Sequence, residues 1–235
     1  MCKHRTGSVL FGAFLLAGVV GPPPAASGEL SGWAGRASGG TVLVDAESRH
    51  EKRAGSGFFL DRPGLVATAL HTVEGARRIR VSIPGSYAAS EARLLAASST
   101  WDLAILFVSW PTDAAYPGLP LDAGPPLPPG VEVAVTGYAQ IEGLESRVAL
   151  TIRGIVSGRL EHRGGFSYLL DLDARPGLSG SPVYRTDSGD VVAVLTRVHG
   201  SGAGAGPGGA APAQALAELV DAIKPFSAHK SLIVR

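Results

Sequence analysis

Cysteine is almost absent from this chain of 235 residues: the only one is Cys2, at the very start. The rest of the chain can therefore form no disulfide, although exported proteins of animal type usually contain them. It also has no thiol that could act as a nucleophile. The fold must be held by its hydrophobic core, and hydrophobic residues make up 45% of the chain.

Charged residues and long apolar runs are also scarce. Only 17% of the residues are charged, which excludes a disordered acidic or basic polymer. The chain has 21 lysines and arginines and 20 aspartates and glutamates. Its net charge of +1 therefore shows no excess of basic residues of the kind that binds nucleic acid. No uninterrupted apolar run reaches the ~18 residues of a membrane-spanning helix, which excludes a protein with several spans.

Residues 1–27 have the pattern of a secretory signal peptide. Lys3 and Arg5 form a basic start, and an apolar stretch of 14 residues follows. The small residues Ala25 and Ser27 fit the cleavage rule, so cleavage is predicted after Ser27. The mature protein is then exported, to a periplasm or out of the cell, and its lack of disulfides favours a bacterial source.

Short strands are predicted for most of the mature chain. The 32 glycines and 17 prolines make up about a fifth of the residues and separate short apolar or alternating runs. Eleven such runs are found, at residues 41–45, 57–60, 65–70, 78–83, 92–97, 103–108, 131–135, 147–156, 166–172, 182–184 and 191–196. The run at 78–83 alternates strictly, with Ile79 and Val81 on one face. This pattern predicts an all-β sandwich or barrel.

One helix is predicted, over residues 213–224. Its apolar residues recur at i, i+3, i+4 and i+7 from Leu216 to Ile223, and Pro212 and Pro225 bound it. We expect this apolar face to pack against a barrel.

Two further segments lack a strand pattern. Residues 111–130 contain seven prolines and are predicted to be an extended, semi-rigid linker. This linker divides the mature chain into an N-terminal part, 28–110, and a C-terminal part, 131–235. The glycine-rich residues 200–212 are predicted to be a flexible loop. They are not a dinucleotide-binding fingerprint, because no strand, helix and downstream acid surround them.

The segment GLSGSP, residues 177–182, is the strongest candidate for chemistry. Glycines on both sides of Ser179 allow a tight bend that exposes the hydroxyl group. The bend also lets the N–H groups of Gly177 and Ser179 converge on one point, where the oxyanion of a tetrahedral intermediate could be stabilised.

A serine hydroxyl is a weak nucleophile and needs a base. His71 is the one histidine of the mature chain that follows an apolar strand and leads into a turn. Asp102 begins the run WDLAILFV and is a candidate for the carboxylate that orients the imidazole. Taken alone, each residue is more readily structural. In the order histidine, aspartate, serine, they indicate a catalytic triad.

This constellation resembles the trypsin-like (chymotrypsin-fold) serine proteases, most of all the bacterial HtrA/Deg-type and glutamyl-endopeptidase-type members. The matching segments are residues 55–76, 101–108, 171–184, 191–196 and 204–220. The resemblance implies two six-stranded antiparallel Greek-key β-barrels with the active site between them. It implies Ser179 as nucleophile, His71 as general base and then acid, Asp102 as orienting carboxylate, and an oxyanion hole at Gly177 and Ser179. HtrA-type proteins usually carry a peptide-binding PDZ domain after the protease, and eleven residues after the predicted helix do not suffice for one.

Three residues near the serine motif bear on substrate preference, again by resemblance. Asp173 stands where trypsin has the aspartate of its specificity pocket, but it is more readily paired with Arg175. Thr196 aligns with the pocket wall, and Val198 stands where trypsin has a glycine that keeps the pocket open. A valine there favours small or medium aliphatic residues before the scissile bond. Glutamyl endopeptidases have a histidine where Leu195 stands, so no preference for glutamate is expected.

The predicted partners are polypeptide substrates, with no nucleic acid and, after signal cleavage, no membrane. No cofactor and no metal are predicted, and the sequence specifies no oligomeric state. The alternative is a catalytically silent trypsin-fold protein that acts in binding or as a scaffold. An esterase of α/β-hydrolase type is disfavoured because its histidine comes last in the chain.

Overall fold

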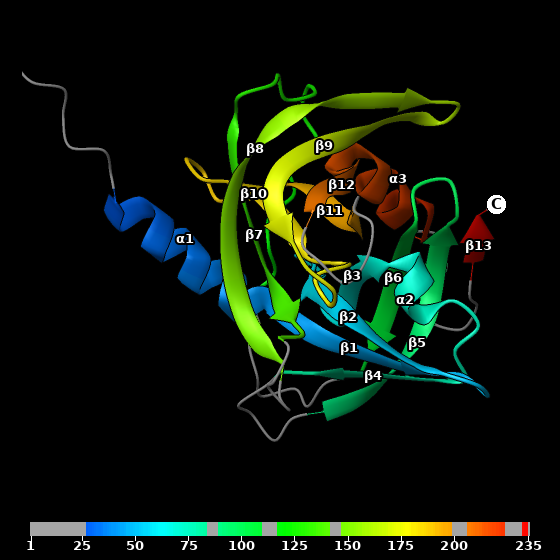
Figure 1. Cartoon of the computed structure of the whole chain (residues 1–235). Coiled ribbons are helices and arrows are strands. Elements are labelled where there is room, and N and C mark those ends of the chain that lie inside the picture. Colours follow the sequence, from blue (N-terminus) through cyan, green and yellow to red (C-terminus); the bar gives the residue numbers. More distant parts are fainter. Residues whose placement is uncertain are drawn as a thin grey trace, which may run out of the picture.

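The computed structural model of the chain describes residues 27–83, 89–109, 117–141, 147–198, 206–223 and 232–234. It contains two β-barrels that lie one above the other in Figure 1, and helix α1 extends away from them. Residues 1–26 of the predicted signal peptide lie outside the described residues. The described residues contain three helices, α1 (Ser27–Gly40), α2 (Leu70–Val73) and α3 (Ala213–Ile223).

Six strands form the first barrel. They are β1 (Thr41–Glu47), β2 (Lys52–Phe59), β3 (Leu65–Ala69), β4 (Arg78–Ser82), β5 (Ala89–Ser98) and β6 (Leu103–Val108). Their order is β5-β4-β1-β2-β3-β6, and antiparallel pairing of β6 with β5 closes the barrel. A further strand, β13 (Leu232–Val234), pairs in parallel with residues Ala96–Ser98 of β5 and was not predicted.

Six more strands form the second barrel. They are β7 (Glu132–Ala139), β8 (Val148–His162), β9 (Gly165–Ala174), β10 (Pro182–Arg185), β11 (Val191–Val198) and β12 (Gly206–Pro212). They close in the order β10-β11-β12-β9-β8-β7, with every pairing antiparallel. The predicted fold class, two closed six-stranded antiparallel barrels with a C-terminal helix, is confirmed.

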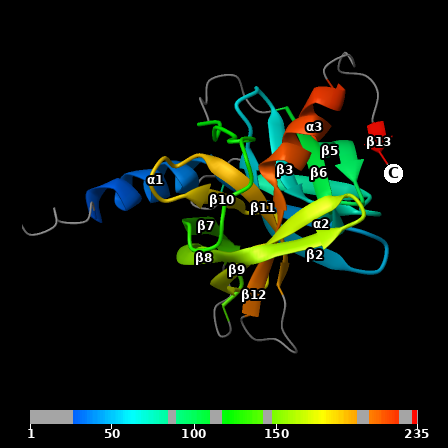
Figure 2. The same ribbon diagram turned by 90° about the horizontal axis from the view of Figure 1, so that it is seen from above.

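Three apolar clusters hold this architecture. One fills the first barrel and a second fills the other barrel. The third lies between them and includes Phe58 of β2, Tyr184 of β10 and Leu216 of α3. Helix α3 contacts β5 and β6 of the first barrel and β11 and β12 of the second, and Figure 2 shows it alongside the strands. The two barrels therefore share a core as well as having their own.

The strand and helix periods account for this burial. In β4, Ile79 and Val81 are buried whereas Arg78 and Arg80 are exposed, as strict alternation predicts. Four apolar residues of α3 face the core between the barrels: Leu216, Leu219, Val220 and Ile223. None of the helices among the described residues is long and apolar enough to cross a membrane.

The prediction of a flexible loop over 200–212 is wrong for residues 206–212, which form β12. This strand fits between β11 and β9 because its residues are small: a Cβ on Gly208 would lie 2.9 Å from a methyl carbon of Leu195. Backbone hydrogen bonds to the neighbouring strands, and not a pattern of side chains, identify residues 206–212 as a strand.

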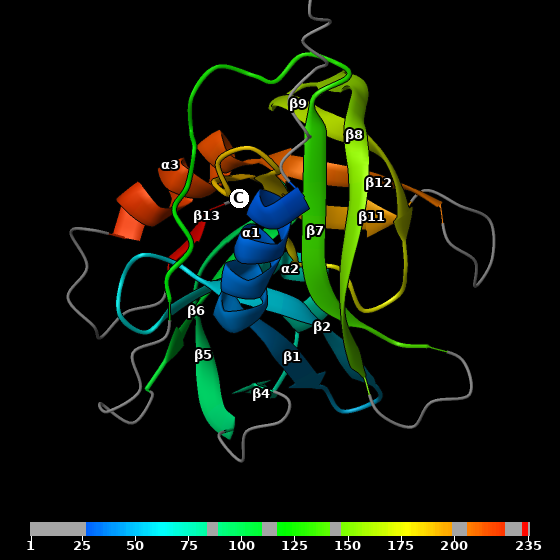
Figure 3. The same ribbon diagram turned by 90° about the vertical axis from the view of Figure 1, so that its left-hand side faces the viewer.

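The N-terminal helix and part of the linker are also described. Helix α1 was not predicted, and it lies in front of the barrels in Figure 3, leading into β1. In the linker, residues 117–130 form no helix or strand, only two isolated β-bridges. These join Leu119 to Leu60 and Leu121 to Val191, so the linker touches both barrels.

Candidate active site

The first barrel brings His71 and Asp102 together. His71 lies in the single-turn helix α2, directly after β3, and Asp102 directly precedes β6. Strands β3 and β6 are antiparallel neighbours in which Ala69 pairs with Leu103. The end of one strand therefore meets the start of the next, which explains how residues 31 positions apart come into contact.

Asp102 holds the histidine turn through three contacts. Its Oδ2 lies 2.6 Å from Nδ1 of His71, and its Oδ1 accepts the His71 backbone N–H at 2.8 Å. Its carbonyl oxygen accepts the N–H of Leu70 at 2.9 Å. Asp102 has a φ of 55°, the only positive φ of a non-glycine residue among those described, and aspartate is one of the residues that tolerates this region. The Asp102 side chain is 17% exposed and that of His71 is 47% exposed, so the imidazole edge remains accessible.

The second barrel supplies the serine turn, between β9 and β10. Ser179 is half-buried, and the flanking Gly177 and Gly180 have φ angles of 94° and 89°. At Gly180 a Cβ would lie 2.0 Å from the carbonyl oxygen of Ser56, so only glycine fits. The bend inferred from the GLSGSP segment is therefore present in the structure.

Two backbone N–H groups of this turn have no acceptor in the described part of the chain: those of Gly177 and Ser179. Because a trans peptide is planar, its C=O and N–H point in opposite directions. The Pro176 carbonyl accepts the Gln140 N–H at 3.1 Å, so the Gly177 N–H points away from Gln140. The Leu178 carbonyl accepts a bond from Ser181 at 3.0 Å, which orients the Ser179 N–H in the same manner. Such paired free donors are what an oxyanion requires.

The histidine turn and the serine turn lie side by side and both approach Gly55 of β2. A Cβ on Gly55 would be 2.8 Å from the carbonyl oxygen of Ser179 and 2.8 Å from Oγ1 of Thr72, the neighbour of His71. The structure thus brings together residues that the sequence places far apart, and it does so at the junction of the two barrels.

The three predicted specificity residues lie on two strands of the second barrel. Asp173, on β9, is exposed and accepts two bonds from Arg175, at 3.0 and 2.5 Å. Thr196, on β11, is buried and donates to the carbonyl oxygen of Gly209 at 3.3 Å. Val198 closes β11, and its side chain lies outside the described residues.

Sequence reasoning overlooked two residues of β2 that bond to these turns. Arg53 donates to backbone carbonyls of the histidine turn, and Ser56 bonds to the serine turn. The only signal was the segment GSG at 55–57, in which a serine stands between two glycines. Nothing in that pattern shows which distant segment the serine would contact.

Comparison with known proteins is consistent with this geometry. The family model of the trypsin-like peptidase domain matches residues 55–194. Protease Do-like 1 of Arabidopsis thaliana chloroplasts is 26% identical over 182 residues, which are 74% of this chain and 40% of that protein. A probable periplasmic serine endoprotease, DegP-like, of Halomonas elongata is 28% identical over 156 residues, 66% of this chain and 31% of that protein. The chain thus spans less than half the length of these relatives.

Solved structures share the fold. The HtrA-type protease AlgW with a tripeptide superimposes with a TM-score of 0.71 at 20% identity, covering 83% of this chain and 63% of that one. A serine endoprotease of Yersinia pestis gives a TM-score of 0.68 at 22% identity, covering 84% and 67%. The matched domain, which spans more than half of the chain and contains His71 and Ser179, shows that this protein belongs to the trypsin-like peptidase family.

Proposed function

We propose that this protein is an exported serine endopeptidase that hydrolyses peptide bonds through an acyl-enzyme on Ser179. The observation that carries the proposal is the 2.6 Å contact between His71 and Asp102 beside a serine turn with two free N–H groups. The family membership and the relatives named as serine proteases support it.

In this mechanism each group has one task. Nε2 of His71 removes the hydroxyl proton of Ser179 as the serine oxygen attacks the peptide carbonyl. Asp102 holds Nδ1, which fixes the tautomer and stabilises the imidazolium that forms. The N–H groups of Gly177 and Ser179 stabilise the oxyanion. The imidazolium then protonates the leaving amine, and a water molecule, deprotonated by His71, hydrolyses the acyl-enzyme.

The substrates are proposed to be polypeptides, with small or medium aliphatic residues accepted before the scissile bond. The pairing of Asp173 with Arg175 supports this preference, because the carboxylate already has a cationic partner. Export through a signal peptide at residues 1–27 fits the periplasmic naming of one relative.

The test is covalent labelling of the mature protein with a fluorophosphonate probe, together with cleavage of a sensitive peptide. We expect labelling of wild-type protein and none of Ser179→Ala, with a loss of turnover on the order of 10⁴ or more. Ser167→Ala is a matched control, because Ser167 is half-buried like Ser179 but its hydroxyl lies 3.2 Å from a ring nitrogen of His162, outside the candidate active site. It should label and cleave normally.

Absence of labelling and cleavage in the folded wild-type protein would instead favour the catalytically silent binding or scaffold protein. Normal cleavage by Ser179→Ala would show that another group is the nucleophile.

A further inference from the structure

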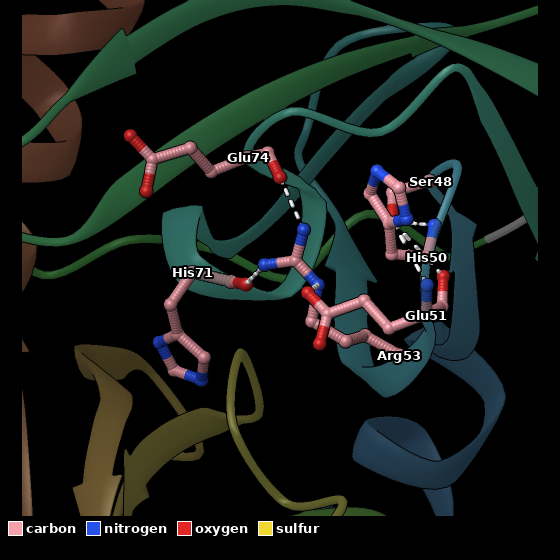
Figure 4. Close-up of polar contacts among 6 residues, drawn as sticks. All are labelled: Ser48, His50, Glu51, Arg53, His71 and Glu74. Atoms are coloured by element: carbon pink, nitrogen blue, oxygen red, sulfur yellow. Dashed lines mark hydrogen bonds and ion pairs between the residues drawn. The ribbon is translucent and has the colours of Figure 1, made fainter.

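Strand β2 passes both catalytic turns and bonds to each of them. Arg53, near its start, donates from Nη1 to the carbonyl oxygen of His71 and from Nη2 to that of Glu74 (Figure 4). In a helix as short as α2, only the Leu70 carbonyl accepts an N–H one turn further on, that of Glu74, and the carbonyl of His71 has no such partner among the described residues. The guanidinium supplies a partner from outside. In Figure 4 the imidazole of His71 extends away from Arg53, so the arginine holds the backbone without contacting the ring.

The arginine is itself held by the β1–β2 turn. Its Nε lies 3.0 Å from a carboxylate oxygen of Glu51. Glu51 is fixed in turn by Ser48, whose Oγ accepts the N–H groups of His50 and Glu51 at 3.2 and 3.1 Å (Figure 4). A chain of contacts therefore runs from this turn to the backbone of the histidine.

Ser56, three residues further along β2, bonds to the serine turn. It is fully buried, and its N–H donates to the carbonyl oxygen of Ser179 at 2.7 Å. Its hydroxyl donates to the carbonyl oxygen of Gly177 at 2.8 Å and accepts the Tyr138 N–H at 2.8 Å. The carbonyl oxygen of Ser56 accepts the hydroxyl of Thr68 at 2.7 Å. Every polar atom of Ser56 is thus engaged.

These bonds restrain the peptide groups on both sides of Gly177. The preceding peptide is held by the N–H of Gln140, and the following one by the hydroxyl of Ser56. Rotation of either peptide would break one of these bonds and leave a buried polar group unpaired, which is costly. The N–H of Gly177 belongs to the first of these peptides, whereas the N–H of Ser179 belongs to the next peptide along, whose Leu178 carbonyl oxygen accepts the Ser181 N–H. The Ser56 hydroxyl holds the peptide that links the two donors, and the Ser56 N–H holds the carbonyl group of Ser179, so both donors keep their orientation in the absence of substrate.

We propose that β2 is a positioning strand of the active site, in which Arg53 holds the histidine turn and Ser56 holds the serine turn. Together they set the general base against the nucleophile and keep the oxyanion donors aligned. Neither side chain contacts a reacting atom. This inference rests on the proposed function and adds to it the residues that preorganise the site.

The main test is Ser56→Ala in the full-length mature protein. We expect kcat to fall about ten- to a hundredfold, the cost of slightly misplaced catalytic groups, with KM changed less than about twofold. The rate of fluorophosphonate labelling should fall in parallel, because it depends on the same serine and oxyanion donors.

The matched control is Thr41→Val. Thr41 is also buried, and its hydroxyl donates to the Ala37 carbonyl at 2.6 Å, away from both catalytic turns. The Thr41→Val variant should lower the melting temperature about as much as Ser56→Ala while leaving kcat and the labelling rate unchanged. Equal losses of kcat in both variants would show that Ser56 acts only through stability and would overturn the proposal.

Arg53→Met tests the other half of the proposal. We expect a smaller loss of kcat, about three- to tenfold, because Asp102 still holds the histidine turn. Arg78→Met is its control: Arg78 is exposed and paired with Glu91 at 2.5 Å, so the same charge is removed without touching a catalytic turn. The double variant Arg53→Met, Ser56→Ala should show the product of the two losses, since the residues hold different segments.

The outcomes separate this inference from the proposed function. If Ser179→Ala is inactive while Ser56→Ala and Arg53→Met have wild-type kcat, the inference fails and the proposed function stands. If Ser179→Ala retains full activity, the proposed function itself fails.

Discussion

The two barrels have the same strand number and closure but differ in what their strands bury. The interior cluster of the first barrel consists of alanine, valine, leucine and isoleucine with Phe59. Every tyrosine that the structure describes lies on a strand of the second barrel: Tyr138, Tyr168 and Tyr184. Two of these place their hydroxyl groups in buried hydrogen bonds, Tyr168 with Leu127 N–H and Tyr184 with Thr136 Oγ1. The interior cluster of the first barrel is thus aliphatic apart from Phe59, whereas the second barrel places aromatic hydroxyl groups in buried hydrogen bonds.

The barrels also divide the candidate chemistry. The first holds the proposed base and its carboxylate on adjoining strand ends, whereas the second holds the proposed nucleophile and oxyanion donors in one turn. Neither barrel has a complete site. The proposed activity therefore depends on how rigidly the barrels are held together, which the cluster between them and the bonds of β2 determine.

Two adjacent phenylalanines of β2 allow the largest test of this comparison. Phe58 packs in the cluster between the barrels, and Phe59 packs inside the first barrel. Each truncation to alanine should cost about 3–5 kcal/mol of unfolding free energy. Only Phe58→Ala should also lower kcat of the folded protein, because it weakens the packing between the two barrels. Denaturant unfolding and kcat measured where both variants are folded would check this, and equal kcat losses would contradict the role of the shared core.

The local geometry of the candidate site could be predicted because each of its signals lies within one short segment of the sequence. The turn around Ser179 requires glycines on both sides of the serine, and this requirement is visible in six consecutive residues. His71 and Asp102 each adjoin an apolar strand, and such strands are recognisable from their composition. Helix α3 follows its 3.6-residue period to within a residue of its expected end.

The rest could not be predicted because backbone bonds define it. Strand β12 consists of glycine, alanine and proline, so no side-chain pattern marks it, and its neighbours β11 and β9 determine its conformation. The hydroxyl of Ser56 reaches a carbonyl group 121 residues away. A sequence shows that a serine lies between two glycines but not which buried carbonyl group faces it.

The buried tyrosines of the second barrel predict that the folded protein loses stability at alkaline pH. Burial raises the pKa of Tyr138, Tyr168 and Tyr184 above the ordinary value. The folded protein then retains protons that the unfolded chain loses, so stability falls as pH rises above the ordinary tyrosine pKa of ~10. Absorbance at the phenolate band should show a group of tyrosines that ionise only as the protein unfolds.

Tyr184→Phe sharpens this prediction. The variant should lose about 1 kcal/mol at neutral pH, where the bond to Thr136 is removed, and its stability should fall less steeply at alkaline pH. An unchanged alkaline slope would mean that Tyr184 ionises equally well in the folded and unfolded states.

The smallest expected effect concerns Asp173, an exposed residue of β9. Its side chain is 47% exposed and that of Arg175 is 43% exposed, and exposed pairs of this kind contribute less than about 1 kcal/mol. Because the carboxylate already has a cationic partner in its own chain, a substrate arginine or lysine would have to replace Arg175 to bind it. We therefore expect Asp173→Asn to be as active as wild-type protein. Its relative cleavage rates across a peptide library should differ from those of wild-type protein by no more than about twofold. A selective loss of cleavage after arginine and lysine would show that the substrate side chain displaces Arg175 from Asp173. Asp173 would then form the floor of the specificity pocket. The second barrel would in that case supply the recognition of substrate charge as well as the nucleophile.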